Sequence, residues 1–453
     1  MGLRLGSRVG WGLVVTLLAG LDALPASAQE DRVPSGVRIG FIYQTGYRPK
    51  LAIRPFEQSA GAREAAERAY DIVQRDLDYS DRFEMARTPV SLASGPIDYR
   101  PWNDLGVVFL VSGDVQTEGG GFMLRLTLHD VVYGSVKEIS AFRLPELSAA
   151  NFRMAVHAAA DELVGWATGQ PGSAASRIAF RRKTADGMEL LVVDSDGENL
   201  QRVTRSAAML FSPSWAPDGQ RLLYHEYDGT TSRIIERGLA GGRSRTIDEL
   251  RGMHLTPTYS PDGRRVAFAR WDAGGSRIYE YDAGRECCMR RLTGGPRDDM
   301  SPTYSADGRQ FAFNSNRLGQ SHIYVVRADG DDPTLLSPFV YGERGEYNAP
   351  DWAPTGSLVA FHGRSRGEFQ IMVADAARPG ATVQQITATG ASEDPSWAPD
   401  ARHVVFSGYR SGGWGLFIID SVTGRERPLV TGAKYELPDW SPVLMTSEAL
   451  AIR

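Results

Sequence analysis

Short apolar runs with β character, separated by polar turns, fill the second half of the chain. Runs such as "RRVAFAR" (264–270) and "RQFAFNS" (309–315) each follow a P-x-[WY] element and a Pro-Asp-Gly or related turn. The motif prolines recur every 43 to 48 residues, at Pro213, Pro257, Pro302, Pro350, Pro395 and Pro438. Because each period holds four short strands and no helical pattern, it predicts a β-propeller blade, not a helical solenoid.

The two ends of the repeat region give the number of blades. Residues 177–204 supply three strands without a preceding P-x-W strand, and "LPDWSPV" (437–443) supplies one such strand with nothing after it. Together they complete one blade, and five full repeats lie between them. The sequence therefore predicts a six-bladed propeller whose last strand closes the ring and removes exposed sheet edges.

Two kinds of residue recur within the repeats, an aromatic residue and an aspartate. The aromatic residues should pack between blades, since large rings bury much surface. They are Trp215, Tyr259, Tyr304, Trp352, Trp397 and Trp440. The turn aspartates are Asp218, Asp262, Asp307 and Asp400. Each is expected to cap its own turn, and a shared metal ring is disfavoured because Thr355 and Ala401 break the Asp-Gly pattern.

The first part of the chain has a mixed α/β pattern. The runs at 37–43 and 50–56 read as strands, residues 57–80 show helical spacing, and "EGGG" (118–121) predicts a hairpin. A second helix has its apolar face at Phe152, Val156, Ala159, Leu163 and Trp166. We expect a small N-terminal α/β domain over 29–170, a linker near 169–176, the propeller over 177–443 and a tail over 444–453.

The first 28 residues have the pattern of a cleaved secretory signal peptide. Arg4 and Arg8 precede an apolar run (11–21), and Ala26-Ser27-Ala28 forms an A-x-A site. Asp22 and Pro25 disfavour a membrane anchor instead. We therefore expect a periplasmic protein without a membrane span in the mature chain. The formal net charge of −5 argues against nucleic-acid binding.

Only two cysteines occur, Cys287 and Cys288, and they are adjacent. A disulfide framework is therefore absent. A vicinal bridge is one alternative. Two reduced thiols are the favoured interpretation, because neighbouring side chains on a strand point to opposite faces.

The candidate catalytic and metal motifs are weak. "GRSRG" (363–367) matches a nucleophile-elbow pattern around Ser365 but falls between two strands, where the motif requires a strand followed by a helix. "DSDGEN" (194–199) is favoured as a hairpin turn over a calcium loop. His225 and His362 occupy equivalent blade positions, so a metal-dependent propeller enzyme such as a polysaccharide lyase is the alternative. The prediction is a non-enzymatic protein with no cofactor, no metal site and no catalytic residues.

Motifs along the whole mature chain resemble those of one known family. They include "VRIGFIY...RPKLAIRPF", "DIVQRDLDYSDRF", "WNDLGVVFLVSGDV", the "DSDG" turn, the six P-x-[WY] repeats and the terminal "DWSP". This combination resembles the TolB family of the Tol-Pal cell-envelope system. The extra "QEDRVPS", the tail "LMTSEALAIR" and the repeat around Cys287 depart from the family pattern.

The resemblance implies what the protein does. It implies a periplasmic, monomeric scaffold whose propeller binds the peptidoglycan-associated lipoprotein Pal and whose N-terminal part communicates with TolA. Outer-membrane proteins are possible further partners. The implied role is outer-membrane integrity and constriction during cell division.

Candidate binding residues follow from the blade links, which emerge on one propeller face just before the motif prolines. Leu210, Ser212 and Leu437 lie in these links. The predicted partner-binding set on this face is His254, Thr256, Met300, Ser301, Asn348, Glu393 and Asp394; the first four match family positions associated with Pal binding. For TolA, the predicted segment is 37–47, with Val37, Arg38, Ile39, Tyr43 and Tyr47.

Overall fold

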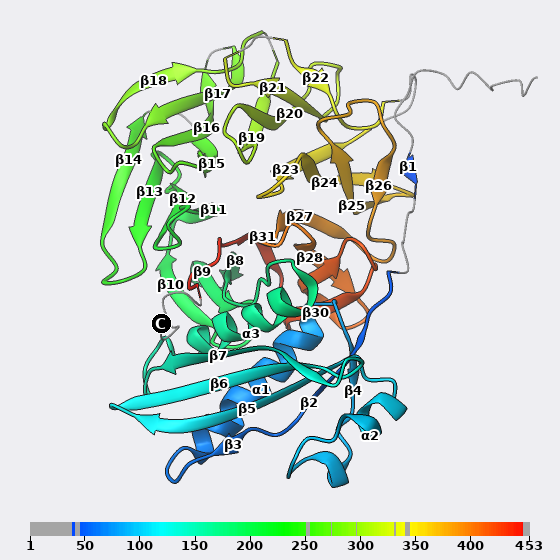
Figure 1. The fold of residues 1–453 in the computed structure, drawn as a ribbon. Coiled ribbons are helices and arrows are strands. Elements are labelled where there is room, and N and C mark those ends of the chain that lie inside the picture. Colours follow the sequence, from blue (N-terminus) through cyan, green and yellow to red (C-terminus); the bar gives the residue numbers. More distant parts are fainter. Residues whose placement is uncertain are drawn as a thin grey trace, which may run out of the picture. The chain divides into compact units, whose positions relative to one another are not determined.

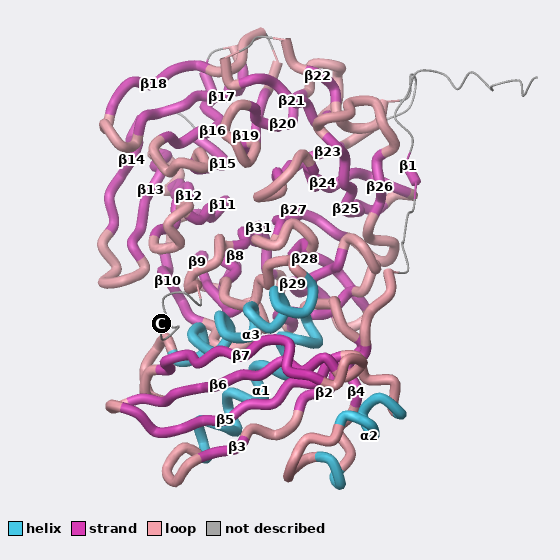
Figure 2. The backbone as a smooth tube through the Cα atoms, in the orientation of Figure 1, coloured by secondary structure: helices cyan, strands magenta, loops and turns pink. Residues whose placement is uncertain are grey.

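The computed structural model describes residues 39–40, 46–250, 254–272, 274–295, 297–329, 332–339 and 345–446. The predicted signal peptide lies outside them. An α/β region precedes six β-sheets arranged around an axis, and among these described residues Figure 2 shows α-helices only in the α/β region. The predicted fold, an N-terminal α/β domain followed by a six-bladed propeller, is confirmed (Figure 1).

The N-terminal domain is a mixed sheet with two long helices on one face. The main strand order is β4 (Glu84–Ala86), β2 (Lys50–Ile53), β5 (Phe109–Glu118), β6 (Gly121–Asp130) and β7 (Ser135–Leu144). Helices α1 (Arg63–Tyr79) and α3 (Phe152–Thr168) share one buried core with the sheet, while short α2 (Tyr99–Asp104) adjoins a second, smaller core. The predicted hairpin is present, and Gly119 and Gly120 adopt the positive φ of its turn.

Helix α1 begins later than its periodicity suggests. Residues 57 and 58 form a short strand, β3 (Glu57–Gln58), which pairs in parallel with β5. Gly61 has φ +85°, a conformation that a helix interior does not contain. The helical interpretation of residues 57–62 is therefore wrong, because this segment extends the sheet before the chain turns into α1.

Six four-stranded antiparallel units form the propeller, and one of them carries an added strand. Five are continuous in sequence. Their strands are β11 (Met209–Trp215), β12 (Arg221–Tyr227), β13 (Ser232–Gly238), β14 (Ser244–Leu250); β15 (His254–Tyr259), β16 (Arg265–Asp272), β17 (Gly275–Asp282), β18 (Cys287–Arg291); β19 (Asp299–Tyr304), β20 (Gln310–Ser315), β21 (His322–Arg327), β22 (Thr334–Leu335); β23 (Tyr347–Trp352), β24 (Leu358–Ser365), β25 (Glu368–Asp375), β26 (Val383–Gln385); and β27 (Ser392–Trp397), β28 (His403–Arg410), β29 (Gly413–Asp420), β30 (Glu426–Thr431).

The sixth blade joins the two ends of the repeat region. It contains β8 (Arg177–Thr184), β9 (Gly187–Asp194) and β10 (Gln201–Ser206), with β31 (Tyr435–Trp440) as its inner strand. Strand β31 pairs with β8 in antiparallel register. The predicted ring closure is thus confirmed. The added strand, β1 (Ile39–Gly40), pairs in parallel with β26 at the outer edge of another blade.

The recurring side chains have the predicted packing and turn-capping contacts. Tyr259 packs with apolar residues of two successive blades, and its hydroxyl donates to Glu236 Oε2 of the preceding blade at 2.5 Å. The turn aspartates accept a hydrogen bond from a backbone N–H two residues later, as Asp218 does from Gln220 at 2.8 Å. The aromatic residues therefore pack between blades and the aspartates cap their turns.

The favoured interpretation of the two cysteines as reduced thiols is wrong, and the alternative, a vicinal bridge, is the one observed. Cys287 and Cys288 are joined by a disulfide at the start of β18. Glu286 and Cys288 have φ values of +56° and +66°. This left-handed backbone departs from an extended strand, so the two neighbouring side chains lie on the same side.

Candidate functional site

Each inner strand of the propeller has the same irregularity before its motif proline. The pairing with the next strand shifts register in all six blades. The residue before the proline has a left-handed φ of 45° to 54° in every blade; these residues are Ser212, Thr256, Ser301, Ala349, Asp394 and Leu437. A bulge redirects the side chains around it, and strained backbone of this kind gathers at binding sites.

The six bulges surround a cavity of about 290 Å³ at the propeller axis. Five of the seven residues predicted on this face line it: Thr256, Met300, Ser301, Asn348 and Asp394. Glu393 is half-buried beside them but does not line the cavity. The backbone of His254 pairs with Arg270 at the start of β15, and its side chain lies outside the described part of the molecule.

Sequence reasoning did not single out a second ring of residues that lines the same cavity. It consists of the residues between each motif proline and its aromatic residue: Ser214, Thr258, Thr303, Asp351, Ser396 and Asp439. Four of these side chains accept a backbone N–H from the next blade. Trp215 N–H, for example, donates to Asp439 Oδ2 at 2.6 Å and Trp397 N–H to Asp351 Oδ2 at 2.7 Å. All six residues occupy the x position of the repeated P-x-[WY] motif, and this shared position is the sequence feature that could have identified the ring.

The cavity wall is acidic. Burial raises the pKa of Asp351 to about 6 and that of Asp394 to about 6. Burial, and secondarily the charge of Asp351, raises the pKa of Asp439 well above its ordinary value. The site therefore presents carboxyl groups with raised pKa values, among hydroxyl and amide side chains.

The two equivalent histidines do not form a shared site. His362 lines the cavity, and its Nδ1 accepts the backbone N–H of Asp394 at 3.0 Å, while burial lowers its pKa to about 4. His225 is 1 % exposed, lies within 2.8 Å of Ser232 Oγ through Nε2, and does not line the cavity. His362 therefore orients the Asp394 backbone, and nothing in this arrangement favours the lyase alternative.

The nucleophile-elbow match at Ser365 lies in a β-hairpin. Ser365 ends β24 and pairs with Glu368 at the start of β25. Arg366 and Gly367 form the turn with positive φ. Since strands flank the motif on both sides, it lacks the strand-to-helix geometry of a hydrolase nucleophile.

The N-terminal segment is described only in part. Ile39 lies in β1, where it pairs with Val383. Tyr47 is 83 % exposed. Val37, Arg38 and Tyr43 lie outside the described residues. In the part of the chain that the structure describes, no helix is long and apolar enough to cross a membrane.

Comparison with protein families matches both domains. The TolB amino-terminal domain model matches residues 44–136, and the TolB beta propeller domain model matches residues 166–444, more than half of the chain. The chain belongs to the TolB family. The resemblance drawn from the sequence is thereby confirmed.

Individual relatives agree with the TolB assignment. A Tol-Pal system protein TolB from Thioalkalivibrio sulfidiphilus is 30% identical over 53% of this chain and 56% of its own length. One from Thiobacillus denitrificans is 36% identical over 38% and 40%. The matched regions thus span about half the length of these curated relatives. The fold resembles that of TolB from Acinetobacter baumannii, with a TM-score of 0.77 and 24% identity over 89% of this chain and 99% of that one.

Proposed function

We propose that this protein is a non-enzymatic periplasmic scaffold of the Tol-Pal system, which binds the lipoprotein Pal at the propeller axis and contacts TolA through its N-terminal segment. This role serves outer-membrane integrity and constriction during cell division. The observation that carries the proposal is the ring of six bulges around the axial cavity. Family membership supports protein partners, since the curated relatives are named as Tol-Pal system proteins.

The cavity mouth has the properties of a protein-docking surface. The bulge residues are half-buried while the prolines after them are buried, so each blade presents one side chain on a fixed backbone. Ser301 N–H donates to Thr256 Oγ1 at 3.1 Å, and Asn348 Oδ1 accepts from Ser321 Oγ at 2.7 Å. A surface held by such contacts loses little conformational entropy when it binds.

A pulldown from detergent-solubilised envelope tests the Pal proposal. The wild-type protein should recover a lipoprotein with a peptidoglycan-binding domain, identified by mass spectrometry. The double variant Thr256→Arg, Met300→Glu should recover at least about tenfold less, because it places bulk and charge in the docking surface. Thr355→Arg, Leu358→Glu is the matched control, since both residues are exposed around the turn between β23 and β24, outside the cavity lining.

Circular dichroism should show that all three proteins are folded. Equal recovery by the double variant would move the binding surface elsewhere, and absence of any such lipoprotein would contradict the Pal proposal. In the same experiment, a chain lacking residues 29–47 should keep the lipoprotein and lose TolA. Retention of TolA would contradict the role proposed for the N-terminal segment.

A further inference from the structure

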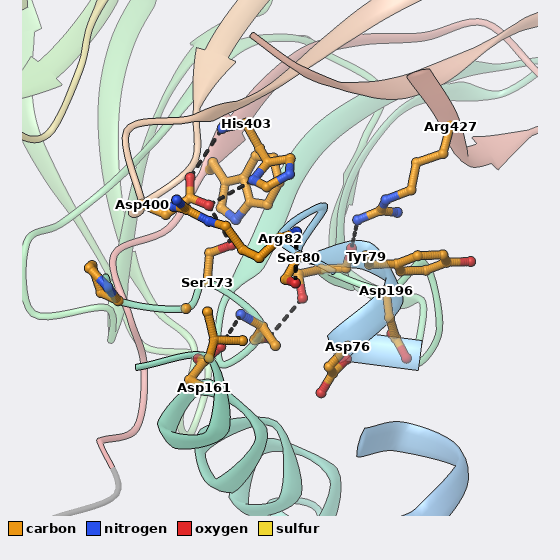
Figure 3. A pocket seen from close by; sticks show the side chains of 16 residues that line it. Asp76, Tyr79, Ser80, Arg82, Asp161, Ser173, Asp196, Asp400, His403 and Arg427 are labelled. Carbon is orange, nitrogen blue, oxygen red and sulfur yellow. Dashed lines mark hydrogen bonds and ion pairs between the residues drawn. The ribbon is translucent and has the colours of Figure 1, made fainter. Parts of the chain in front are cut away.

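A buried histidine connects the N-terminal domain to the propeller. His403 opens β28 and is 2 % exposed, and Asp81 follows α1 and is also 2 % exposed. His403 Nε2 lies 3.2 Å from Asp81 Oδ2, and His403 Nδ1 lies 2.7 Å from Asp400 Oδ2 in the preceding turn. Figure 3 shows His403 and Asp400 on the wall of a small pocket that also contains residues of the N-terminal domain.

Both ring nitrogens of His403 therefore face carboxylate oxygens. Each of these carboxylates also accepts hydrogen bonds from other groups. Arg425 donates to Asp81 Oδ1 at 2.9 Å, and the backbone N–H groups of Arg402 and His403 donate to Asp400 Oδ1 at 3.0 and 3.1 Å. An ionised carboxylate only accepts hydrogen bonds, so both imidazole nitrogens must donate, and only the doubly protonated ring does so.

The neighbouring charged groups fit an imidazolium. Asp420 at the end of β29 accepts two hydrogen bonds from Arg402, and Arg425 also pairs with Asp78. Arg82 extends beside Asp400 and His403 (Figure 3). The cluster thus holds four carboxylates and three arginines, and the positive charge of a protonated His403 offsets the remaining negative charge. The carboxylates are those of Asp78, Asp81, Asp400 and Asp420, and the arginines are Arg82, Arg402 and Arg425. One carboxylate oxygen each of Asp81 and Asp420 and a ring nitrogen of His403 lie near enough together for a metal ion, but arginines already pair with both carboxylates.

We propose that the proton on His403 is a latch between the two domains: the protonated ring joins Asp81 of the N-terminal domain to Asp400 of the propeller, and its loss at alkaline pH releases this contact. A neutral ring has one nitrogen lone pair, which faces a carboxylate oxygen and repels it at these distances. This device does not depend on which protein binds at the propeller axis.

The direction of the pH effect follows from the same contacts. Although burial opposes the charge, Asp400 and Asp81 raise the pKa of His403 to about 9, above its ordinary 6.5. A raised histidine pKa stabilises the folded arrangement fully below pH 6.5, and this contribution is lost as the pH rises through about 9. The latch is therefore closed at neutral pH and opens in alkali.

Histidine NMR tests the protonation state directly. In protein with isotope-labelled histidine, the His403 signals are assigned by their loss in His403→Gln. We expect imidazolium shifts up to about pH 8 and a titration near 9. A titration at or below about 6.5 would overturn the proposal.

Hydrogen exchange measures whether the proton holds the domains together. After correction for intrinsic rates, peptides covering 76–82 and 169–176 should lose about tenfold of their protection between pH 7 and pH 10, relative to propeller-core peptides. His403→Gln and Asp81→Asn should lose that protection already at pH 7. His322→Gln is the matched control, since His322 is 3 % exposed and contacts Ser337 of its own blade. Unchanged protection in Asp81→Asn, or an equal loss in the control, would exclude the latch.

Discussion

The propeller axis and the contact between the domains are both polar, but they differ in how much space they enclose and in how their carboxyl groups are paired. At the axis, six left-handed residues surround about 290 Å³ of open space, and the carboxyl groups there have raised pKa values. At the domain contact, the pocket beside His403 holds only about 20 Å³, room for roughly one water molecule. Around His403, arginines pair with Asp81 and Asp420, and His403 itself contacts Asp400.

This difference indicates that the axis serves binding and that the domain contact serves stability. Carboxylates that lie near one another without basic partners cost stability, and such a cost persists where a surface is kept for binding. Carboxylates paired with arginine across a contact hold that contact in place, and removal of one partner leaves a buried charge. We therefore expect substitutions at the axis to alter binding and acid response, and substitutions at the domain contact to alter stability.

The largest effect is expected from Arg402→Ala at the domain contact. Arg402 is the bidentate partner of Asp420, whose side chain is 0 % exposed, and it also donates to the backbone carbonyl of Asp81. Its loss leaves the buried Asp420 carboxylate without its hydrogen-bonded arginine and should lower the free energy of unfolding by about 3–5 kcal/mol. Urea unfolding followed by tryptophan fluorescence measures this.

The exposed pair Arg327–Asp329 supplies the control for Arg402. Both side chains are 72 % exposed and screened by solvent, so Arg327→Ala should leave the urea midpoint almost unchanged. Equal losses in the two variants would mean that burial does not distinguish the domain contact from the surface.

A smaller effect of opposite sign is expected at the axis. Because burial raises the pKa of Asp351 to about 6, ionisation of this group destabilises the propeller above pH 6, and the penalty disappears as the pH falls toward the ordinary value near 4. Asp351→Asn removes the charge and keeps an oxygen for the Trp397 N–H. It should raise the free energy of unfolding at pH 7.5 by about 1–2 kcal/mol.

Unfolding at pH 5.0 and pH 7.5 decides whether the Asp351 charge is responsible. The difference between wild type and Asp351→Asn should shrink at the lower pH. A difference that stays constant, or a variant less stable at both values, would show that the carboxylate is not strained at neutral pH.

The sequence predicted the propeller well because its signal is repeated. Six copies of the P-x-[WY] motif determine the strand pattern, and the incomplete ends at 177–204 and 437–443 determine how the ring closes. The N-terminal hairpin was equally readable from its glycines. Helix α1 was misplaced at its start because residues 57 and 58 join the sheet through a pairing with β5, which local periodicity does not report.

The sites were less predictable, for two physical reasons. The axial residues were found by their place before each proline, but their left-handed φ was not, since residues such as Thr256 and Leu437 give no local sign of it. The latch was missed because Asp81 and His403 are 322 positions apart and belong to no repeat. Only the docking of two finished domains brings them together.

The smallest effect is expected at the disulfide in β18, which lines neither the axial cavity nor the pocket beside His403. Cys287 and Cys288 enclose almost no chain, so the bond removes little entropy from the unfolded state. The variant Cys287→Ser, Cys288→Ser should change the free energy of unfolding by about 1 kcal/mol or less. Alkylation without reductant, followed by intact mass analysis, should leave wild-type protein unlabelled and add two labels after reduction. Labelling without reductant would show that the two thiols are free and that the left-handed backbone at Cys288 has another cause.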